Sequence, residues 1–371
     1  MKIVILTHTL NNNYGGLLQA FALQTVLKRM GHDTVTARFS VCCFKLRIIR
    51  FISYFIRRYL LGNLSQNAER KISVHTSRFV DTYMDTIDYF GGKTRPVPGV
   101  LKLYDAIVVG SDQVWRPAYM HVPAYFLDFT KDEKMKRIAY AASFGQDNWG
   151  EFSPALTRKC ALYAKRFDAI SVREDSAVKL CKEKLGVDAL HLLDPTLLLD
   201  KEEYIRLADQ EYPIVREKIL MSYILDRSED KRKITELLSH SLQLVPLEVM
   251  PAESLNTKCD NILAATYLPV EEWLAGFRDA EFILTDSFHG CVFSILFNKP
   301  FLVIGNKERG MSRFHSLLHM FELEDRLIDS SETVFSIDFL INKIDWNNVN
   351  RIRTEKKEYS ISFLLKYLVH V

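Results

Sequence analysis

The chain has 371 residues, of which 48% are hydrophobic and 26% charged, a composition that suits a globular protein and excludes collagen-like and disordered chains. Its 49 basic and 46 acidic side chains leave a net charge of +3, too small to predict nucleic acid as the main partner. At this length we expect two domains.

The six cysteines form no C-x-x-C pair, and no histidine cluster has the spacing of a zinc site. We therefore expect reduced cysteines and neither a resident cofactor nor a metal, although Mg²⁺ held on a phosphate would leave little trace in a sequence. The apolar run at residues 3–6 is too short for a signal peptide, and polar residues interrupt the stretch that follows. These features predict a cytoplasmic protein.

Short apolar runs alternate with amphipathic segments, which predicts strands that alternate with helices. The expected strands are 2–6, 105–109, 137–141, 169–172, 218–225, 244–249, 281–285 and 300–304. Because the rhythm restarts after Pro195, we predict two α/β lobes with parallel sheets. Their expected bounds are 1–200 and 213–345, followed by a helical tail over 346–371.

Residues 41–71 differ from this pattern because arginines and lysines are interleaved with aromatic and aliphatic side chains. Such an amphipathic basic helix can lie among anionic headgroups, with its apolar face below the phosphates. An anionic membrane surface at the inner face of the plasma membrane is therefore one expected partner. The alternative is a segment that packs on the first lobe, with its arginines solvated or paired.

The turn after the first strand contains Asn13, Tyr14, Gly15 and Gly16 and opens a helix expected from Leu17. Glycine lets a ligand approach the backbone, and free N–H groups at a helix start favour a phosphate or carboxylate. The alternative is a strand-to-helix turn that needs glycine for its own geometry.

Asp112, Gln113 and Trp115 follow the strand expected at 105–109, at the edge of a parallel sheet where ligands bind. Asp112 could accept a proton from a hydroxyl group, and Trp115 could stack on a sugar ring. Alternatively, Asp112 caps the next helix and Trp115 belongs to the core.

Cations and a histidine follow other predicted strands. Arg173 comes after the strand at 169–172 and suits a carboxylate or phosphate, unless it pairs with Glu174 or Asp175. His289 lies beside a predicted helix start, where it could bind an anion or transfer a proton. Asp286 or Ser287 could cap that helix. With His289, the three cations Lys307, Arg309 and Arg313 would form an anion pocket on the second lobe, unless they belong to a solvated loop.

Six sequence motifs occur in the order found in polysaccharide pyruvyl transferases. They are Asn-Tyr-Gly-Gly, Gly-Ser-Asp-Gln-Val-Trp, Ser-Val-Arg-Glu, Leu-Asp-Pro-Thr, Thr-Asp-Ser-Phe-His-Gly and Ser-Arg-Phe. From about Ile3 to Leu327 the chain resembles this family. The resemblance implies two Rossmann-like lobes of the glycosyltransferase-B type facing a central crevice. It also implies phosphoenolpyruvate as donor, a sugar with two neighbouring hydroxyls as acceptor, and a pyruvate ketal as product.

The resemblance also suggests roles for the residues at these motifs. Asp112 is the expected catalytic base, and His289 would hold the phosphate or act as an acid. The expected donor-binding residues are Arg173, Ser287, His289, Gly290, Lys307, Arg309 and Arg313. The expected acceptor-binding residues are Asn13, Tyr14, Gly15, Gly16, Gln113 and Trp115.

One motif departs from the family pattern, because many members have Arg-Leu-His where this chain has Ser287, Phe288 and His289. Arg309 or Arg313 would then have to replace the missing arginine, or the donor differs. Two other functions stay open: a glycosyltransferase that uses a nucleotide-sugar donor on the same fold, and a non-catalytic scaffold for polysaccharide assembly. The expected acceptor is a capsular or exopolysaccharide precursor, either free, nucleotide-linked or lipid-linked.

Overall fold

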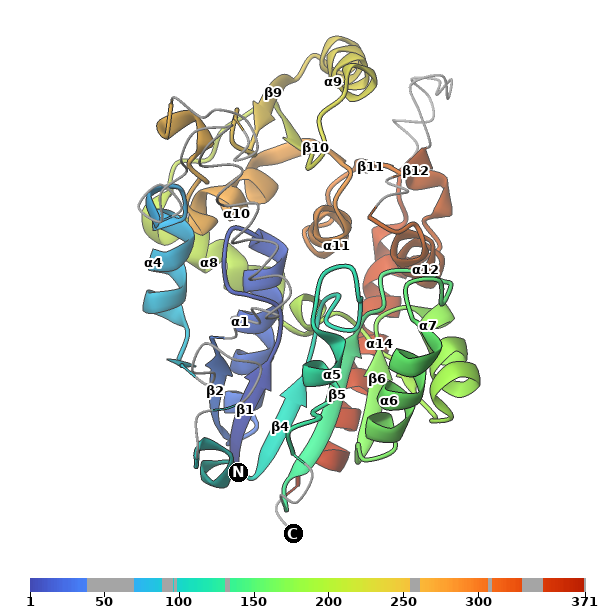
Figure 1. Ribbon diagram of the computed structural model, residues 1–371. Coiled ribbons are helices and arrows are strands. Elements are labelled where there is room, and N and C mark those ends of the chain that lie inside the picture. The colour runs from blue at the N-terminus through green and yellow to red at the C-terminus, as the bar shows by residue number, and fades with distance from the viewer. Residues whose placement is uncertain are drawn as a thin grey trace, which may run out of the picture. The chain divides into compact units, whose positions relative to one another are not determined.

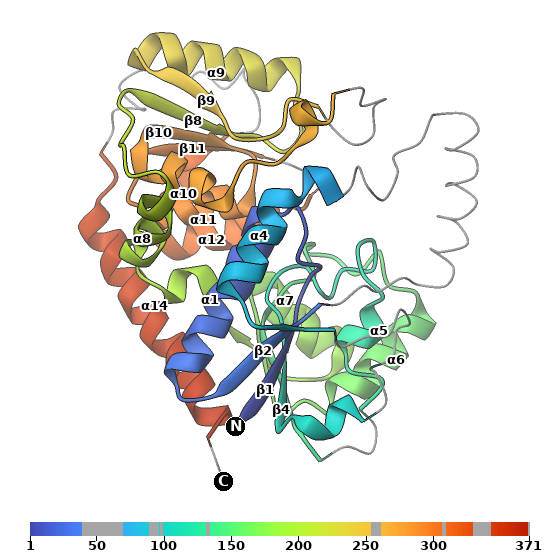
Figure 2. The ribbon, with the colours of Figure 1, turned by 90° about the vertical axis from the view of Figure 1, so that its left-hand side faces the viewer.

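The computed structural model describes residues 1–38, 70–88, 96, 99–130, 134–253, 261–305, 309–328 and 343–369. Lys307 and all of the basic segment except its last two residues lie outside the described residues. The chain forms two compact units, each with its own parallel sheet (Figures 1 and 2). Unit 1 comprises Met1–Pro195, Pro251–Tyr267 and Ser362–Val371, and unit 2 comprises Thr196–Met250 and Leu268–Ile361.

Unit 1 is built on a seven-stranded parallel sheet with the order β3-β2-β1-β4-β5-β6-β7. Its strands are β1 (Lys2–Leu6), β2 (Asp33–Ala37), β3 (Thr86–Ile87), β4 (Ala106–Val109), β5 (Lys136–Ala142), β6 (Ala169–Val172) and β7 (Leu190–His191). The residues of β4 and β6 are all buried, as is usual for parallel sheets covered by helices. From β1 the chain adds strands first on one side of the sheet (β2, β3) and then, from β4 on, on the other side. The loops after β1 and β4 therefore leave the sheet at its topological switch point, where open α/β sheets bind ligands.

The helices of unit 1 flank this sheet (Figure 1). They include α1 (Tyr14–Arg29), α4 (Val74–Tyr83), α5 (Val122–Tyr125), α6 (Pro154–Ala164) and α7 (Asp175–Leu180). α1 begins at the Asn13 cap and ends before Gly31, whose φ of 85° is readily available to glycine. Cys160 and Cys181 are buried free thiols, and burial raises the pKa of both to about 12, so they act as core residues.

Unit 2 is built on a five-stranded parallel sheet with the order β12-β11-β10-β8-β9. Its strands are β8 (Ile219–Tyr223), β9 (Val245–Glu248), β10 (Ala280–Thr285), β11 (Phe301–Ile304) and β12 (Leu327–Ile328). Its helices include α8 (Lys201–Glu211), α9 (Glu229–Leu242), α10 (Val270–Asp279), α11 (Phe288–Leu296) and α12 (Ser312–Phe321). The strands expected at 281–285 and 300–304 therefore agree closely with β10 and β11.

The division of the chain differs in three places from the predicted bounds. Residues 196–200 belong to unit 2, although the predicted first lobe extends to residue 200. The stretch Pro251–Tyr267 belongs to unit 1, although it lies within the predicted second lobe. The C-terminal helix α14 (Trp346–Tyr367) is divided between the units after Ile361, where a separate tail was expected. Among the described residues, the helices are too short or too polar to cross a membrane.

Candidate active site

The loop after β4 holds Asp112 in a backbone conformation that few residues adopt. Gly110 precedes it with a φ of 123°, and a Cβ atom at that position would lie 2.1 Å from the carbonyl oxygen of Tyr140. Asp112 itself has a φ of 72° and pairs through its backbone with Ala142, the last residue of β5. Left-handed backbone at a residue other than glycine is unfavourable and is frequent at functional sites.

The carboxylate of Asp112 is buried and receives hydrogen bonds from three directions. Its Oδ1 atom accepts from Nη2 of Arg173 at 3.1 Å and from the backbone N–H of Gln113 at 2.9 Å. Its Oδ2 atom lies 3.4 Å from Nδ2 of Asn13, at the start of α1. The loops after β1, β4 and β6 thus meet at this carboxylate.

Arg173 joins Asp112 to a second aspartate. Its Nη1 atom donates to Oδ2 of Asp194 at 2.8 Å, and only 4% of the residue is exposed. Burial alone would lower the pKa of Arg173, but the carboxylates of Asp112, Asp194 and Glu174 together raise it. Arg173 is therefore a permanent cation that fixes two aspartates.

In this structure Arg173 serves the protein's own carboxylates, and its expected contact with the donor stays a prediction. Its two terminal nitrogens bind carboxylates of the protein, and the partners are Asp112 and Asp194, not the neighbours Glu174 or Asp175 that the alternative named. Glu174 instead accepts from Oγ of Ser143 at 2.5 Å. Asp194 was missed as a site residue, although it occupies the Leu-Asp-Pro-Thr motif.

The turn at the start of α1 contributes one side chain to this cluster. Asn13 caps the helix by accepting from the backbone N–H of Gly16 at 3.0 Å, while its amide nitrogen faces Asp112. Tyr14 is buried with its ring centroid 5.8 Å from that of Tyr267, so it is a core residue and not a contact for the acceptor. Gly15 and Gly16 are buried in the first turn of the helix.

Trp115 also belongs to the core, which corrects the prediction that it stacks on a sugar. The residue is fully buried, and its ring lies parallel to that of Phe126 at a centroid distance of 4.5 Å. Its Nε1 atom donates to the carbonyl oxygen of Tyr125 at 3.2 Å. Gln113 is buried as well, and its Oε1 atom accepts from Nη1 of Arg116 at 3.2 Å.

In unit 2, the end of β10 supports the first turn of α11. Oγ1 of Thr285 donates to the carbonyl oxygen of Tyr223 at 2.7 Å and accepts from the backbone N–H of Ser287 at 3.0 Å. A Cβ atom on Gly290 would lie 2.1 Å from the same Oγ1 atom. Gly290 is thus needed for close packing of this turn, which places His289 at the helix start.

Asp286 connects this turn to the loop after β8. It does not cap α11, whose N-cap is Ser287; its carboxylate accepts from the backbone N–H groups of Leu225 at 2.6 Å and Asp226 at 3.1 Å. Nζ of Lys231 donates to the same carboxylate at 2.7 Å. Asp286 is therefore a structural residue that fixes the loop.

Arg309 is bound to the same loop, because its Nε and Nη2 atoms donate to the two carboxylate oxygens of Asp226 at 2.5 and 2.8 Å. The charge of Arg309 is therefore balanced by Asp226, and its expected contact with the donor stays a prediction. Arg313 donates from Nη2 to the carbonyl oxygen of Arg309 at 2.6 Å.

His289 and Arg313 both lie next to the ring of Phe288. The His289 and Phe288 rings are 5.3 Å apart at an angle of 83°, and the Arg313 guanidinium lies 5.5 Å from the centre of the Phe288 ring. Both residues are 5% exposed. With Ser287 at the helix start, they form a group of nitrogen and hydroxyl donors that can bind an anion.

The family model for polysaccharide pyruvyl transferases matches residues 13–308. The chain belongs to the polysaccharide pyruvyl transferase family. No curated protein matches this pyruvyl transferase significantly.

Solved structures share its fold at low sequence identity. The UDP-GlcNAc 2-epimerase of Neisseria meningitidis, solved with UDP-GlcNAc, is 11% identical with a TM-score of 0.51, over 99% of both chains. The UDP-GlcNAc 2-epimerase of Methanocaldococcus jannaschii is 12% identical with a TM-score of 0.50, over 96% of this chain and 99% of the other. The pyruvyl transferase therefore has two Rossmann-like units of the glycosyltransferase-B type, as predicted from its sequence.

Proposed function

We propose that this pyruvyl transferase transfers pyruvate from phosphoenolpyruvate to two neighbouring hydroxyls of a sugar, in a precursor of a bacterial capsule or exopolysaccharide. The observation that carries the proposal is the family match over residues 13–308. The site geometry is compatible with it, because a fixed carboxylate in unit 1 suits a hydroxyl acceptor, and the donors of unit 2 suit an anion.

In the proposed reaction the methylene carbon of phosphoenolpyruvate gains a proton, and the neighbouring carbon becomes electron-poor. One sugar hydroxyl attacks that carbon and gives its proton to Asp112. The carbon–oxygen bond to phosphate breaks, and the second hydroxyl closes the ketal ring with loss of its proton. One proton stays on the new methyl group and the other leaves with inorganic phosphate, so the step needs neither a resident cofactor nor an oxidant.

His289 and Arg313 are the proposed phosphate contacts. Arg309 is paired with Asp226, whereas the Arg313 guanidinium lies over Phe288, the residue before His289. Arg313 therefore replaces the arginine that many family members have next to this histidine. Ser287 adds a hydroxyl group at the start of α11, where the helix dipole favours negative charge.

The test is release of inorganic phosphate from phosphoenolpyruvate in the presence of candidate lipid-linked and nucleotide-linked sugars. The product should be roughly 70 daltons heavier than the acceptor, the mass of pyruvic acid less one water. We expect His289→Ala to slow phosphate release by about a hundredfold or more, because a positioned acid or phosphate contact is lost.

His240→Ala is the matched control, because His240 is exposed in the last turn of α9 in the same unit. Release of a nucleotide diphosphate from a nucleotide-sugar, with none of phosphate from phosphoenolpyruvate, would instead identify a glycosyltransferase. Equal rates in wild type and His289→Ala would reject the role of His289.

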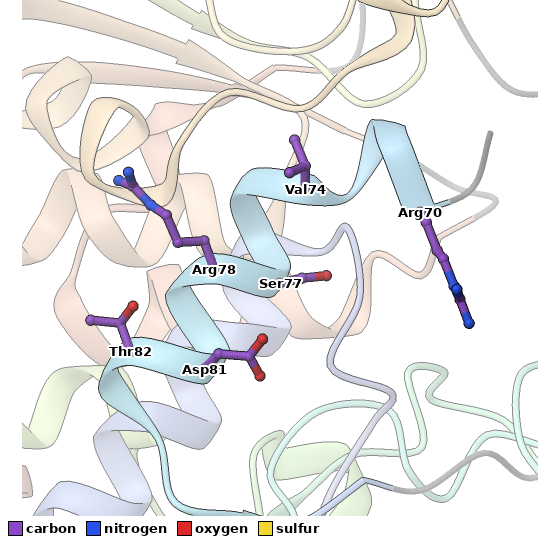
Figure 3. A pocket seen from close by; sticks show the side chains of 6 residues that line it. All are labelled: Arg70, Val74, Ser77, Arg78, Asp81 and Thr82. Atoms are coloured by element: carbon purple, nitrogen blue, oxygen red, sulfur yellow. The ribbon is translucent and has the colours of Figure 1, made fainter. Parts of the chain in front are cut away.

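We further propose that the protein is cytoplasmic and binds the anionic inner face of the plasma membrane through the basic segment at 41–71. The two described residues of this segment, Arg70 and Lys71, are also basic and exposed. A shallow pocket of about 500 Å³ lies along α4, and Figure 3 shows Val74 and Arg78 projecting from that helix and Arg70 from the helical residues just before it. Val74 and both arginines are exposed.

Vesicles containing phosphatidylserine should sediment the wild-type protein at low salt, and replacing Arg47, Arg50, Arg57 and Arg58 by Glu should abolish this. A charge-matched control replaces four exposed basic residues elsewhere by Glu: Lys179, Lys182, Lys184 and Arg232. Equal sedimentation of both variants, or none of the wild type, would refute membrane binding.

A further inference from the structure

Tyr119 is an aromatic residue that the protein holds rigidly at its surface. It follows β4 in the same loop as Asp112, and 43% of the residue is exposed. Its backbone N–H donates to the carbonyl oxygen of Arg116 at 3.1 Å, and the next residue, Met120, is buried in the core. The ring is thus displayed on a short, anchored turn.

Arg116 packs against the ring of Tyr119. Its guanidinium carbon lies 4.5 Å from the centre of the Tyr119 ring, within the range of a cation–π contact. The arginine is itself buried, and its Nε atom donates to Oε1 of Glu151 at 3.0 Å. The other oxygen of Glu151 accepts from the backbone N–H of Ala118 at 3.0 Å, so one carboxylate fixes both the arginine and the turn.

A series of contacts links this ring to the catalytic carboxylate. Arg116 donates from Nη1 to Oε1 of Gln113, and the backbone N–H of Gln113 donates to Asp112. Gly145 leaves room for the Gln113 side chain, because a Cβ atom there would lie 2.0 Å from its Oε1 atom. The loops after β4 and β5 are therefore built together around Arg116.

A flat exposed ring beside a partly exposed carboxylate is a combination that suits a sugar. The apolar C–H face of a pyranose packs on an aromatic ring, and its hydroxyls donate to a carboxylate. The Glu151 side chain is 30% exposed. We propose that Tyr119 is the stacking platform of the acceptor-sugar subsite, with Glu151 as its polar neighbour. This inference rests on the proposed function for the identity of the sugar as acceptor.

The subsite can be tested by saturation-transfer NMR with three methyl pyranosides of gluco, galacto and manno configuration, in the presence and absence of phosphoenolpyruvate. We expect wild type to transfer saturation to the C–H protons on one sugar face. Tyr119→Ala should weaken binding by about three- to tenfold, and Tyr119→Phe should retain it, because the ring supplies the contact. Tyr359→Ala is the matched control, since Tyr359 is 48% exposed and lies on α14.

Absence of saturation transfer to all three sugars in wild type, or equal transfer in wild type and Tyr119→Ala, would overturn the proposal. The phosphate-release assay separates this result from the proposed function. If sugars bind through Tyr119 but phosphoenolpyruvate is not consumed, the sugar subsite stands and the donor assignment fails. If phosphoenolpyruvate is consumed at an unchanged acceptor KM in Tyr119→Ala, the reaction stands and the subsite lies elsewhere.

Discussion

Asp112→Asn is expected to lower the rate of pyruvyl transfer by about a thousandfold, within the range of about a hundredfold to ten-thousandfold typical for loss of a general base. The amide keeps an oxygen that can accept from Arg173 and from the N–H of Gln113, so the loop should keep its shape. The amide cannot take the hydroxyl proton. Initial rates of phosphate release with a saturating acceptor measure the effect, and thermal unfolding shows whether the fold is intact.

Asp188→Asn provides the control, because Asp188 lies in the same unit, is 90% exposed and forms an ion pair with the surface residue Lys182. Its transfer rate should match that of wild type. The KM for phosphoenolpyruvate should also stay within about twofold in Asp112→Asn if the carboxylate acts on the acceptor. A folded Asp112→Asn variant with more than about a tenth of the wild-type rate would show that the base is another group.

Strands dominated by apolar residues could be predicted from the sequence, even where they include one buried serine, as β6 does with Ser171. A strand that alternates with threonine could not. β10 and β11 are predicted to within about one residue because each contains a buried apolar run, Phe282–Leu284 and Phe301–Ile304. β2 was missed because its buried residues include Thr34 and Thr36. Oγ1 of Thr36 accepts from Nε2 of Gln24 at 2.9 Å, so this polar side chain can be buried because it is hydrogen-bonded. The strand therefore lacks the apolar run by which the other strands were predicted.

The site residues were found at strand ends, but their partners were not. Asp112 and Arg173 follow β4 and β6, and the strand order places β5 between them. A sequence gives no direct account of this order, so the ion pair between residues 61 positions apart could not be read from it. Arg309 and Asp226 are 83 positions apart and were missed for the same reason.

Arg173→Met is expected to lower the free energy of unfolding of unit 1 by about 3–5 kcal/mol, the range for removing one partner of a buried ion pair. The change leaves Asp112 and Asp194 buried without their shared cation, and Glu174 nearby adds a third negative charge. Urea unfolding measures the loss. Arg232→Met is the matched control, because Arg232 also contacts two carboxylates, Glu229 and Glu236, but is 57% exposed, so its loss should leave the urea midpoint nearly unchanged.

Arg173→Lys distinguishes an arginine that positions Asp112 from one that binds the donor. Lysine keeps the charge but cannot reach Asp112 and Asp194 with the two nitrogens of a planar fork. If Arg173 acts through Asp112, the variant should lose kcat by about tenfold or more while the KM for phosphoenolpyruvate stays within about twofold. A rise in that KM with little change in kcat would instead show that Arg173 binds phosphoenolpyruvate directly. Loss of a contact made equally in the ground state and the transition state raises KM and leaves kcat unchanged.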